Sequence, residues 1–209
     1  MSGVSGFGPL PYTLAGVSIT VSGVPAPIQS VANQNGVQSV NFQTPCEVPP
    51  GTATVIVQVS GSSATVSGVA VFAAAPSVFN YQGPSGKAYA AVIDASNGNY
   101  VTPSNPAHPG GTYYVYVTGL GQASPAISTN SSGTVGATQS VNLPVIAGVN
   151  NAGVPVVFAQ YATGYIGVYI VGFQIPQDAP TGTDQPLAVA VLVNGQLVFS
   201  NPTYLPAVN

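Results

Sequence analysis

Charged residues are nearly absent from this chain of 209 residues. It holds one Lys or Arg residue and four acidic residues, so 2% of the chain is charged, against about 25% in typical soluble domains. A nucleic-acid partner requires Lys and Arg side chains that displace counterions, and an anionic membrane surface attracts proteins through the same side chains. The composition therefore excludes both kinds of partner.

Cysteine and long apolar runs are scarce as well. Cys46 is the single cysteine, which excludes an intrachain disulfide framework. Polar or turn-forming residues interrupt every apolar run before 18 residues, so we expect no transmembrane helix and no membrane insertion. The first ten residues lack the charged and apolar regions of a signal peptide. Cytosolic proteins usually carry far more charge to stay soluble, and a surface with so little charge favours association. We therefore expect an exported protein, extracellular or at the cell surface, that tolerates or exploits self-association.

The chain is rich in β-forming segments separated by turns. Apolar and polar residues alternate in four runs that are rich in Val, Thr, Tyr and Ile: 17–22, 53–59, 112–118 and part of 187–193. Turn-forming pairs separate such runs: Ser22-Gly23, Ser60-Gly61, Asn97-Gly98 and Asn194-Gly195. The 25 glycines and 20 prolines leave little room for helices. We predict an all-β fold.

The two halves of the sequence are similar to each other. Gly23-Val24-Pro25 recurs as Gly153-Val154-Pro155, and residues 41–47 and 50–52 have counterparts at 172–178 and 181–183. The turns at Ser60-Gly61 and Asn194-Gly195 also correspond, so the spacing runs from 130 to 134 residues, which is typical of a duplicated module. We predict two tandem Ig-like antiparallel β-sandwiches, over residues 1–75 and 76–209, joined near 73–76.

Several segments resemble a known family: 14–28, 50–55, 104–110, 116–121, 179–182 and 193–195. With these segments the chain resembles the uncharacterised "Solibacter C-terminal domain" family of exported acidobacterial proteins. The resemblance implies tandem Ig-like modules of the IPT/TIG type and an exported setting, and it implies no activity. The chain departs from the family at Cys46, where the family tends to place Trp.

Candidate catalytic groups are few and scattered. The carboxylates are Glu47, Asp94, Asp178 and Asp184, and His108 is the single histidine. A glycosidase needs two carboxylates across a cleft, but Glu47 and Asp178 occupy equivalent places in two separate modules. His108 lies in a loop rich in Pro and Gly, without the partners of a metal site or the nucleophile motif of a hydrolase. We predict no enzyme activity, no catalytic, cofactor-binding or metal-binding residues, and no cofactor.

Four further positions leave alternatives open. Cys46 is an inert, small buried hydrophobe, the site of an intermolecular disulfide or a nucleophile, and the scarcity of cations and helices that could activate a thiol disfavours the last. Residues 94–99 resemble a calcium loop only faintly, and a turn at Asn97-Gly98 explains them better. Lys87 is either an exposed residue of a turn or crosslinked to an Asn beside Asp94 or Glu47. Asn130 begins the single Asn-x-Ser/Thr glycosylation sequence of the chain.

Two functions remain for such a chain. The first is a non-enzymatic structural or interaction protein that self-associates into a homo-oligomer or homopolymer, including a filament. The second is a carbohydrate-binding or adhesive module that uses exposed tyrosines. Tyr113, Tyr114 and Tyr116 share one predicted strand, with Tyr114 and Tyr116 on the same face, and Tyr161, Tyr165 and Tyr169 form a second group.

The second predicted module contains a strand, expected at 113–121, that has no counterpart in the first predicted module. The strand expected at 113–121 precedes Gly153 by roughly 30 residues, so its equivalent would lie before residue 1. We therefore expect an incomplete first module with an unpaired edge. Two explanations remain open. Either the chain is a piece of a longer protein, or a terminal segment of another copy, such as Ser2–Leu14 or Pro202–Asn209, pairs there by strand addition and builds an open fibre.

Overall fold

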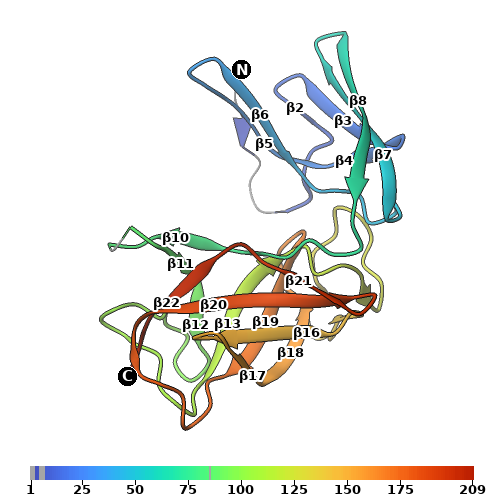
Figure 1. Cartoon of the computed structure of the whole chain (residues 1–209). Coiled ribbons are helices and arrows are strands. Elements are labelled where there is room, and N and C mark those ends of the chain that lie inside the picture. The colour runs from blue at the N-terminus through green and yellow to red at the C-terminus, as the bar shows by residue number, and fades with distance from the viewer. Residues whose placement is uncertain (1–2, 5–7, 85) are drawn as a thin grey trace. The chain divides into compact units, whose positions relative to one another are not determined.

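The computed structural model describes residues 3–4, 8–84 and 86–209, and the regular elements in this part of the chain are all β-strands (Figure 1). The four alternating runs form β3 (Val17–Val21), β7 (Gly51–Val59), β13 (Thr112–Thr118) and β20 (Gly182–Val193). The all-β prediction is confirmed. Within the described ranges, no helix is long and apolar enough to cross a bilayer.

The chain divides into two compact units. Unit 1 comprises Met1–Ala73 together with Ala126–Ala137 and Ala162–Gly167, and unit 2 comprises Ala74–Pro125, Thr138–Tyr161 and Val168–Asn209. The first division falls within the expected link at 73–76. Segments 126–137 and 162–167 join unit 1, although the expected ranges 1–75 and 76–209 assigned them to the second module. Segment 126–137 bonds to residues of unit 1, as described below, and segment 162–167 pairs with segment 126–137 through Ser132–Ile166 and Gly133–Thr163 bridges.

Unit 1 contains two sheets. The smaller has the order β1-β5-β6, and the larger has the order β2-β3-β7-β8 with β4 also paired to β3. The remaining strands of this unit are β1 (Gly3–Val4), β2 (Thr13–Leu14), β4 (Val24–Ala26), β5 (Ile28–Gln34), β6 (Val37–Phe42) and β8 (Ser62–Val71). Buried side chains of both sheets form one core, with Ile19 of β3, Ile28 of β5 and Ala53 of β7 among them.

Unit 2 contains two larger sheets. Their orders are β10-β11-β22-β20-β16-β17, with β21 beside β20, and β12-β13-β19-β18-β15-β14, with β9 beside β13. The strands of the first are β10 (Asn80–Gln82), β11 (Ala88–Ala90), β16 (Val145–Val149), β17 (Ala152–Val154), β21 (Gln196–Phe199) and β22 (Thr203–Val208). The strands of the second are β9 (Ser77–Val78), β12 (Val92–Asp94), β14 (Ala123–Ser124), β15 (Ser140–Val141), β18 (Val156–Tyr161) and β19 (Val168–Gln174).

The same succession of hairpins occurs in both units. Strands β3 to β8 pair as β3–β4, β5–β6, β3–β7 and β7–β8, and strands β16 to β21 pair as β16–β17, β18–β19, β16–β20 and β20–β21. Ile28 pairs with Phe42 just before a register shift, as Val156 pairs with Phe173. The duplication inferred from the sequence therefore reappears in the strand pairing.

Strand register corrects the alignment of the two halves. Val24 pairs with Val21 across the β3–β4 turn, and the corresponding pair across the β16–β17 turn is Ala152 with Val149. Val24 therefore corresponds to Ala152, so the two Gly-Val-Pro triplets lie two residues out of structural register. Short sequence matches among Gly, Val and Pro mislead here because these residues recur throughout the chain.

Two-residue turns connect the hairpins of unit 1. Asn35-Gly36 and Ser60-Gly61 both have positive φ at their two residues, 52° and 84° in the first and 48° and 88° in the second. Such angles match the right-handed twist of the flanking strands, and glycine adopts them without a steric penalty. The predicted turns at Ser60-Gly61 and Asn194-Gly195 are confirmed.

Candidate functional site

The principal difference between the two units lies at one edge of the β5–β6 hairpin. In unit 2, β19 lies between β18 and β13. Its equivalent in unit 1, β6, has β5 on one side and no further strand on the other among the residues that the structure describes. The expectation that the first module lacks a strand agrees with this pairing.

The inner face of β7 shows the consequence for burial. Val55, Val57 and Val59 of β7 correspond to Leu187, Val189 and Val191 of β20, because the two sets pair with equivalent residues of β3 and β16. The three residues of β20 are fully buried, whereas the three of β7 are only partly buried. The core of unit 1 is therefore less well covered than the core of unit 2.

Strand β8 is exposed on the same side. In unit 2, β21 and β22 both pair with the edge of β20 that corresponds to the β8 edge of β7. Strand β20 also contacts β9 of the other sheet, and β9 pairs with β13. Strands β21 and β22 therefore lie on the side of unit 2 where β13 covers the core. Val66 of β8 and Thr203 of β22 occupy equivalent positions, because they pair with Val55 and Leu187. Val66 is 57% exposed and Thr203 is 2% exposed. We call the edge of β6 together with the inner face of β8 around Val66 the open slot.

The backbone of β6 has hydrogen-bonding groups directed into the open slot. Gln34 and Val37 flank the two-residue turn at Asn35-Gly36, and the pair that flanks such a turn exchanges hydrogen bonds. Alternate residues of β6 therefore bond to β5, and the amides of Gln38 and Val40 point away from β5. These amides form an edge that a further strand can extend.

The C-terminal segment does not serve as the donor predicted for this edge. Residues 203–208 form β22, which pairs with β20 and β11 inside unit 2. Leu205, Ala207 and Val208 are buried there, so withdrawing this strand would open the core of unit 2. The prediction for Pro202–Asn209 is wrong. The other predicted donor, Ser2–Leu14, lies partly outside the described residues, and Thr13–Leu14 forms β2 of unit 1.

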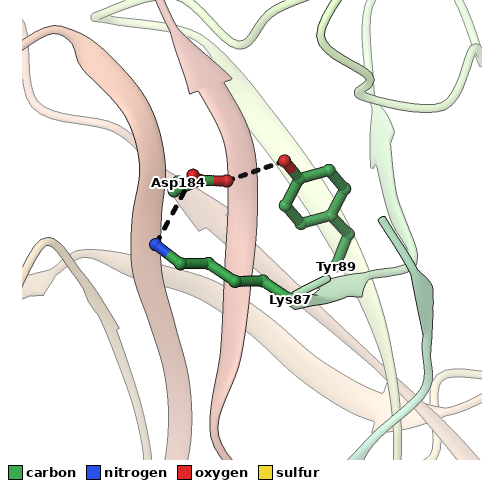
Figure 2. Close-up of polar contacts among 3 residues, drawn as sticks. All are labelled: Lys87, Tyr89 and Asp184. Atoms are coloured by element: carbon green, nitrogen blue, oxygen red, sulfur yellow. Dashed lines mark hydrogen bonds and ion pairs between the residues drawn. The ribbon is translucent and has the colours of Figure 1, made fainter. Parts of the chain in front are cut away.

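The single lysine lies in a small polar cluster of unit 2 (Figure 2). Lys87 Nζ is 3.4 Å from one carboxylate oxygen of Asp184, and the Tyr89 hydroxyl donates a 2.7 Å hydrogen bond to the other. The Lys87 ammonium also lies 4.6 Å from the centre of the Tyr204 ring. Asp184 is thus the carboxylate beside Lys87, whereas the crosslink alternative named Asp94 or Glu47.

This cluster connects three neighbouring strands. Tyr89 lies on β11, Tyr204 on β22 and Asp184 on β20. The prediction missed the pairing of Lys87 with Asp184 because 97 residues separate them in the sequence. In unit 1, Ala53 follows Gly51-Thr52 as Asp184 follows Gly182-Thr183, so the cluster has no charged counterpart there. Its position indicates a structural clamp on β11.

A second polar cluster holds segment 126–137 in unit 1. The Glu47 carboxylate accepts hydrogen bonds from the backbone N–H of Thr129, at 3.2 Å, and from its hydroxyl. The side-chain bond from Thr129 lowers the pKa of Glu47 below its usual value. The backbone N–H of Cys46 donates to Thr129 Oγ1 at 2.7 Å. Burial raises the pKa of the Cys46 thiol, which disfavours the reactive thiolate.

Asn130 forms a second connection of this segment to unit 1. Its Oδ1 accepts from the Leu10 amide at 2.6 Å and its Nδ2 donates to the Leu10 carbonyl at 2.8 Å. The Asn130 backbone N–H donates to Gln43 Oε1 at 2.9 Å. A glycan on Nδ2 would compete with the bond to Leu10, so the geometry disfavours modification at this position.

Asp94 and His108 line a surface pocket of unit 2 together with Ser96 and Tyr113. Asp94 accepts hydrogen bonds from the backbone N–H and hydroxyl of Ser96 at 2.8 and 2.7 Å, and the hydroxyl bond lowers its pKa. His108 Nδ1 lies 2.8 Å from the Asn209 carbonyl oxygen. Ser96 is thus bonded to Asp94 rather than to His108, which is not the geometry of an activated nucleophile.

The turn predicted at Asn97-Gly98 is confirmed by a 2.8 Å bond from the Gly98 amide to the Asp94 carbonyl. Asp178, the remaining acid, is exposed. The described part of the chain contains no group of three or more His, Cys, Asp or Glu side chains placed to hold a metal ion.

The tyrosines do not form an exposed ladder on β13. Tyr113 is buried and faces Phe173, with ring centroids 6.1 Å apart, while Tyr114 packs against Phe158 at 5.4 Å. Tyr161 and Tyr169 are buried against each other in an edge-on arrangement at 5.0 Å. The expected opposition of Tyr113 to Tyr114 and Tyr116 agrees with the alternating burial along β13.

Comparisons with known proteins add little. No protein-family model matches the chain, and no curated protein matches it. One solved structure that the chain resembles is described as the complete structure of manganese lipoxygenase of Gaeumannomyces graminis and partial structure of zonadhesin of Komagataella pastoris. The two are 14% identical, with a TM-score of 0.16, over 97% of this chain and 78% of that chain. A score this low carries no argument about fold or activity.

Proposed function

We propose that the chain is a non-enzymatic structural or interaction protein of the cell exterior, built from two tandem Ig-like β-sandwiches that associate with further copies through the open slot. The observation that carries this proposal is that no strand in the described part of the chain pairs with β6 on the side away from β5, beside an incompletely buried core. The counterpart of this edge in unit 2 is covered by β13. Assignment to the acidobacterial family described above rests on sequence motifs alone and remains part of the proposal.

The low charge of the chain supports association. Surfaces with net charge far from zero repel one another, and such repulsion keeps monomers apart. Strands β5 to β8 contain no charged residue, and natural edge strands usually carry charge, often Lys, to prevent pairing with other chains. An edge without this protection favours strand addition.

The layering of unit 1 disfavours a symmetric contact between two β6 edges. By the correspondence of β6 to β19, β7 to β20 and β8 to the strands beside β20, we expect the sheet β2-β3-β7-β8 to extend one strand beyond β6. A second β6 in the β13 position would bring its own β7 into the space that β8 occupies. The slot therefore suits a single donated strand, which makes a heterologous contact and permits open assembly.

Carbohydrate binding is the alternative function. Sugar-binding sites of this kind use aromatic rings that lie side by side at the surface, whereas Tyr113, Tyr161 and Tyr169 are buried. Screening of the purified chain on a glycan array tests this alternative directly. Saturable binding to one glycan class, lost on substitution of the exposed Tyr100 or Tyr165, would favour it over association.

Sedimentation velocity across a concentration series, with electron microscopy of the same samples, tests the proposal. We expect the average sedimentation coefficient to rise with concentration, and Val40→Lys to suppress this rise by placing a charge on the inner face of β6. Val135→Lys is the matched control, because Val135 is 85% exposed in a loop of unit 1. Concentration-independent monomers, or equal association of the two variants, would contradict the proposal.

A further inference from the structure

We infer that the open slot binds one uncharged, extended polypeptide segment of seven residues, antiparallel to β6, with large apolar side chains at its second and fourth positions. This inference rests on the proposed function, since it names the partner of the same slot. Strand β13 provides the template, because unit 2 shows which segment covers the equivalent edge.

The β13–β19 register gives the alignment of the bound segment. Tyr113 pairs with Phe173, Val115 with Val171 and Val117 with Tyr169. The corresponding residues of β6 are Phe42, Val40 and Gln38, because β5 and β18 pair with the two strands in the same way. The second, fourth and sixth residues of an incoming segment therefore face the core.

The first two of these positions require apolar side chains. Phe42 and Val40 pack against the buried core of unit 1 but remain partly exposed. In unit 2, Tyr113 and Val115 are 1% and 0% exposed beside the equivalent residues. An apolar side chain at each position would remove water from this part of the core, at about 25 cal/mol per Å² of apolar surface buried.

The sixth position is less demanding. Gln38 and Asn33 of unit 1 occupy the places of Tyr169 and Tyr161, which pack against each other in unit 2. Both polar residues are exposed. This end of the slot therefore offers amide groups and water in place of an aromatic pair, so it accepts Thr or Ser as readily as Val.

Charge is excluded from the inward positions. None of the strands β5, β6, β7 and β8 carries an ionisable side chain that could pair with an incoming charge. A Lys at the fourth position of the segment would be placed against Val40 and the partly buried valines of β7 without a partner. The same Lys at the fifth position would point to solvent, because side chains alternate along a strand.

Titration of the full chain with labelled peptides tests this specificity. The probe is the Thr112–Thr118 sequence, Thr-Tyr-Tyr-Val-Tyr-Val-Thr, carrying fluorescein at its N-terminus and read by fluorescence anisotropy. Matched peptides carry Val115→Lys at the fourth position, Tyr116→Lys at the fifth, or Val117→Thr at the sixth. We expect saturable binding of the probe, at least about tenfold weaker binding of V115K, and little change for Y116K and V117T.

Amide hydrogen exchange read by NMR locates the bound peptide. We expect the Gln38 and Val40 amides, which point away from β5, to exchange more slowly when the probe is added. Protein variants Val40→Lys and Gln38→Pro should each weaken binding. Gln38→Pro removes an outward amide and keeps the core side chains. It therefore tests the slot even if Val40→Lys fails to fold.

The outcomes separate this inference from the proposed function. Equal binding of V115K and Y116K, or no slowing of exchange at Gln38 and Val40, overturns the inference even where the chain self-associates. Specific binding of the probe to a chain that stays monomeric at all concentrations upholds the inference and contradicts self-association.

Discussion

Units 1 and 2 share their hairpins and differ in how completely their cores are covered. Strands β3 to β8 and β16 to β21 pair in the same order, and both β5–β6 and β18–β19 contain the same register shift. Nevertheless, equivalent valines of β7 and β20 are partly buried in one unit and fully buried in the other. Burial in this fold therefore depends on strands outside the repeated hairpins.

Strand β13 contributes to that difference. Its residues Tyr113, Val115 and Val117 are 1%, 0% and 0% exposed. Full burial of a side chain such as Val contributes about 1.5–3 kcal/mol, so an equivalent strand would add several kcal/mol to unit 1. We expect unit 1 to be the less stable of the two units when its slot is empty.

The largest expected effect comes from truncating an equivalent phenylalanine in each unit. Phe173→Ala should destabilise unit 2 by about 3–5 kcal/mol, because the ring is fully buried beside Tyr113. Phe42→Ala should cost unit 1 roughly half as much by the same principle, since its ring is already partly exposed. Denaturant unfolding followed by hydrogen exchange in each unit measures both values. Equal losses would remove the claimed difference in coverage.

The polar clamp on β11 is the next target. Asp184→Ala removes the acceptor of the Tyr89 hydroxyl and the partner of Lys87, and should cost unit 2 about 1–3 kcal/mol. Asp184→Asn keeps an acceptor and tolerates the φ of 51° at this position, so its cost should stay within about 1 kcal/mol. Thermal unfolding compares the two variants. A larger loss from D184N than from D184A would contradict the clamp.

Asn130 tests whether segment 126–137 belongs to unit 1. Asn130→Ala deletes two hydrogen bonds to Leu10 and should cost unit 1 about 1–2 kcal/mol. Faster hydrogen exchange should follow around Leu10 and Gln43, with unit 2 unaffected. The control Ser132→Ala changes an exposed residue of the same segment. Destabilisation confined to unit 2 would contradict the discontinuous unit.

The smallest expected effect is a pH dependence of unit 1. The pKa of Glu47 is lowered in the folded state by the bond from Thr129, from an ordinary value of 4.5. The carboxylate therefore adds stability above pH 4.5, and that stability is lost as the pH falls through the lowered pKa. Glu47→Gln should flatten this part of the stability profile. Thermal unfolding at pH values from about 3 to 6, the range in which this carboxylate titrates, measures the effect. An unchanged profile would contradict the role of Glu47.

Much of the local structure could be predicted from the sequence. Alternation over 112–118 and 53–59 predicted β13 and β7, because side-chain direction alternates along a strand regardless of what it pairs with. Ser60-Gly61 and Asn194-Gly195 predicted turns through the preference of glycine for positive φ. Among the described residues of the first half, no strand takes the place of β13, in agreement with the count of residues along the sequence.

Contacts between distant segments were not predictable in the same way. Lys87 meets Asp184 and Thr129 meets Glu47 across 97 and 82 residues, and neither pair leaves a local pattern. The error for Pro202–Asn209 has the same origin. This terminal segment reads as a free end, yet it forms β22 between β11 and β20.

The sequence by itself determined that the chain is all-β, that several of its hairpins turn where glycine follows Asn or Ser, and that it contains almost no charge. These properties depend on one residue and its nearest neighbours in the chain. The tertiary structure decided which valines are covered, which carboxylate meets Lys87 and which segments complete unit 1. Each of these depends on which strands lie side by side. Burial and pairing are set by residues that are close in space but distant in the chain, and no short stretch of sequence specifies them.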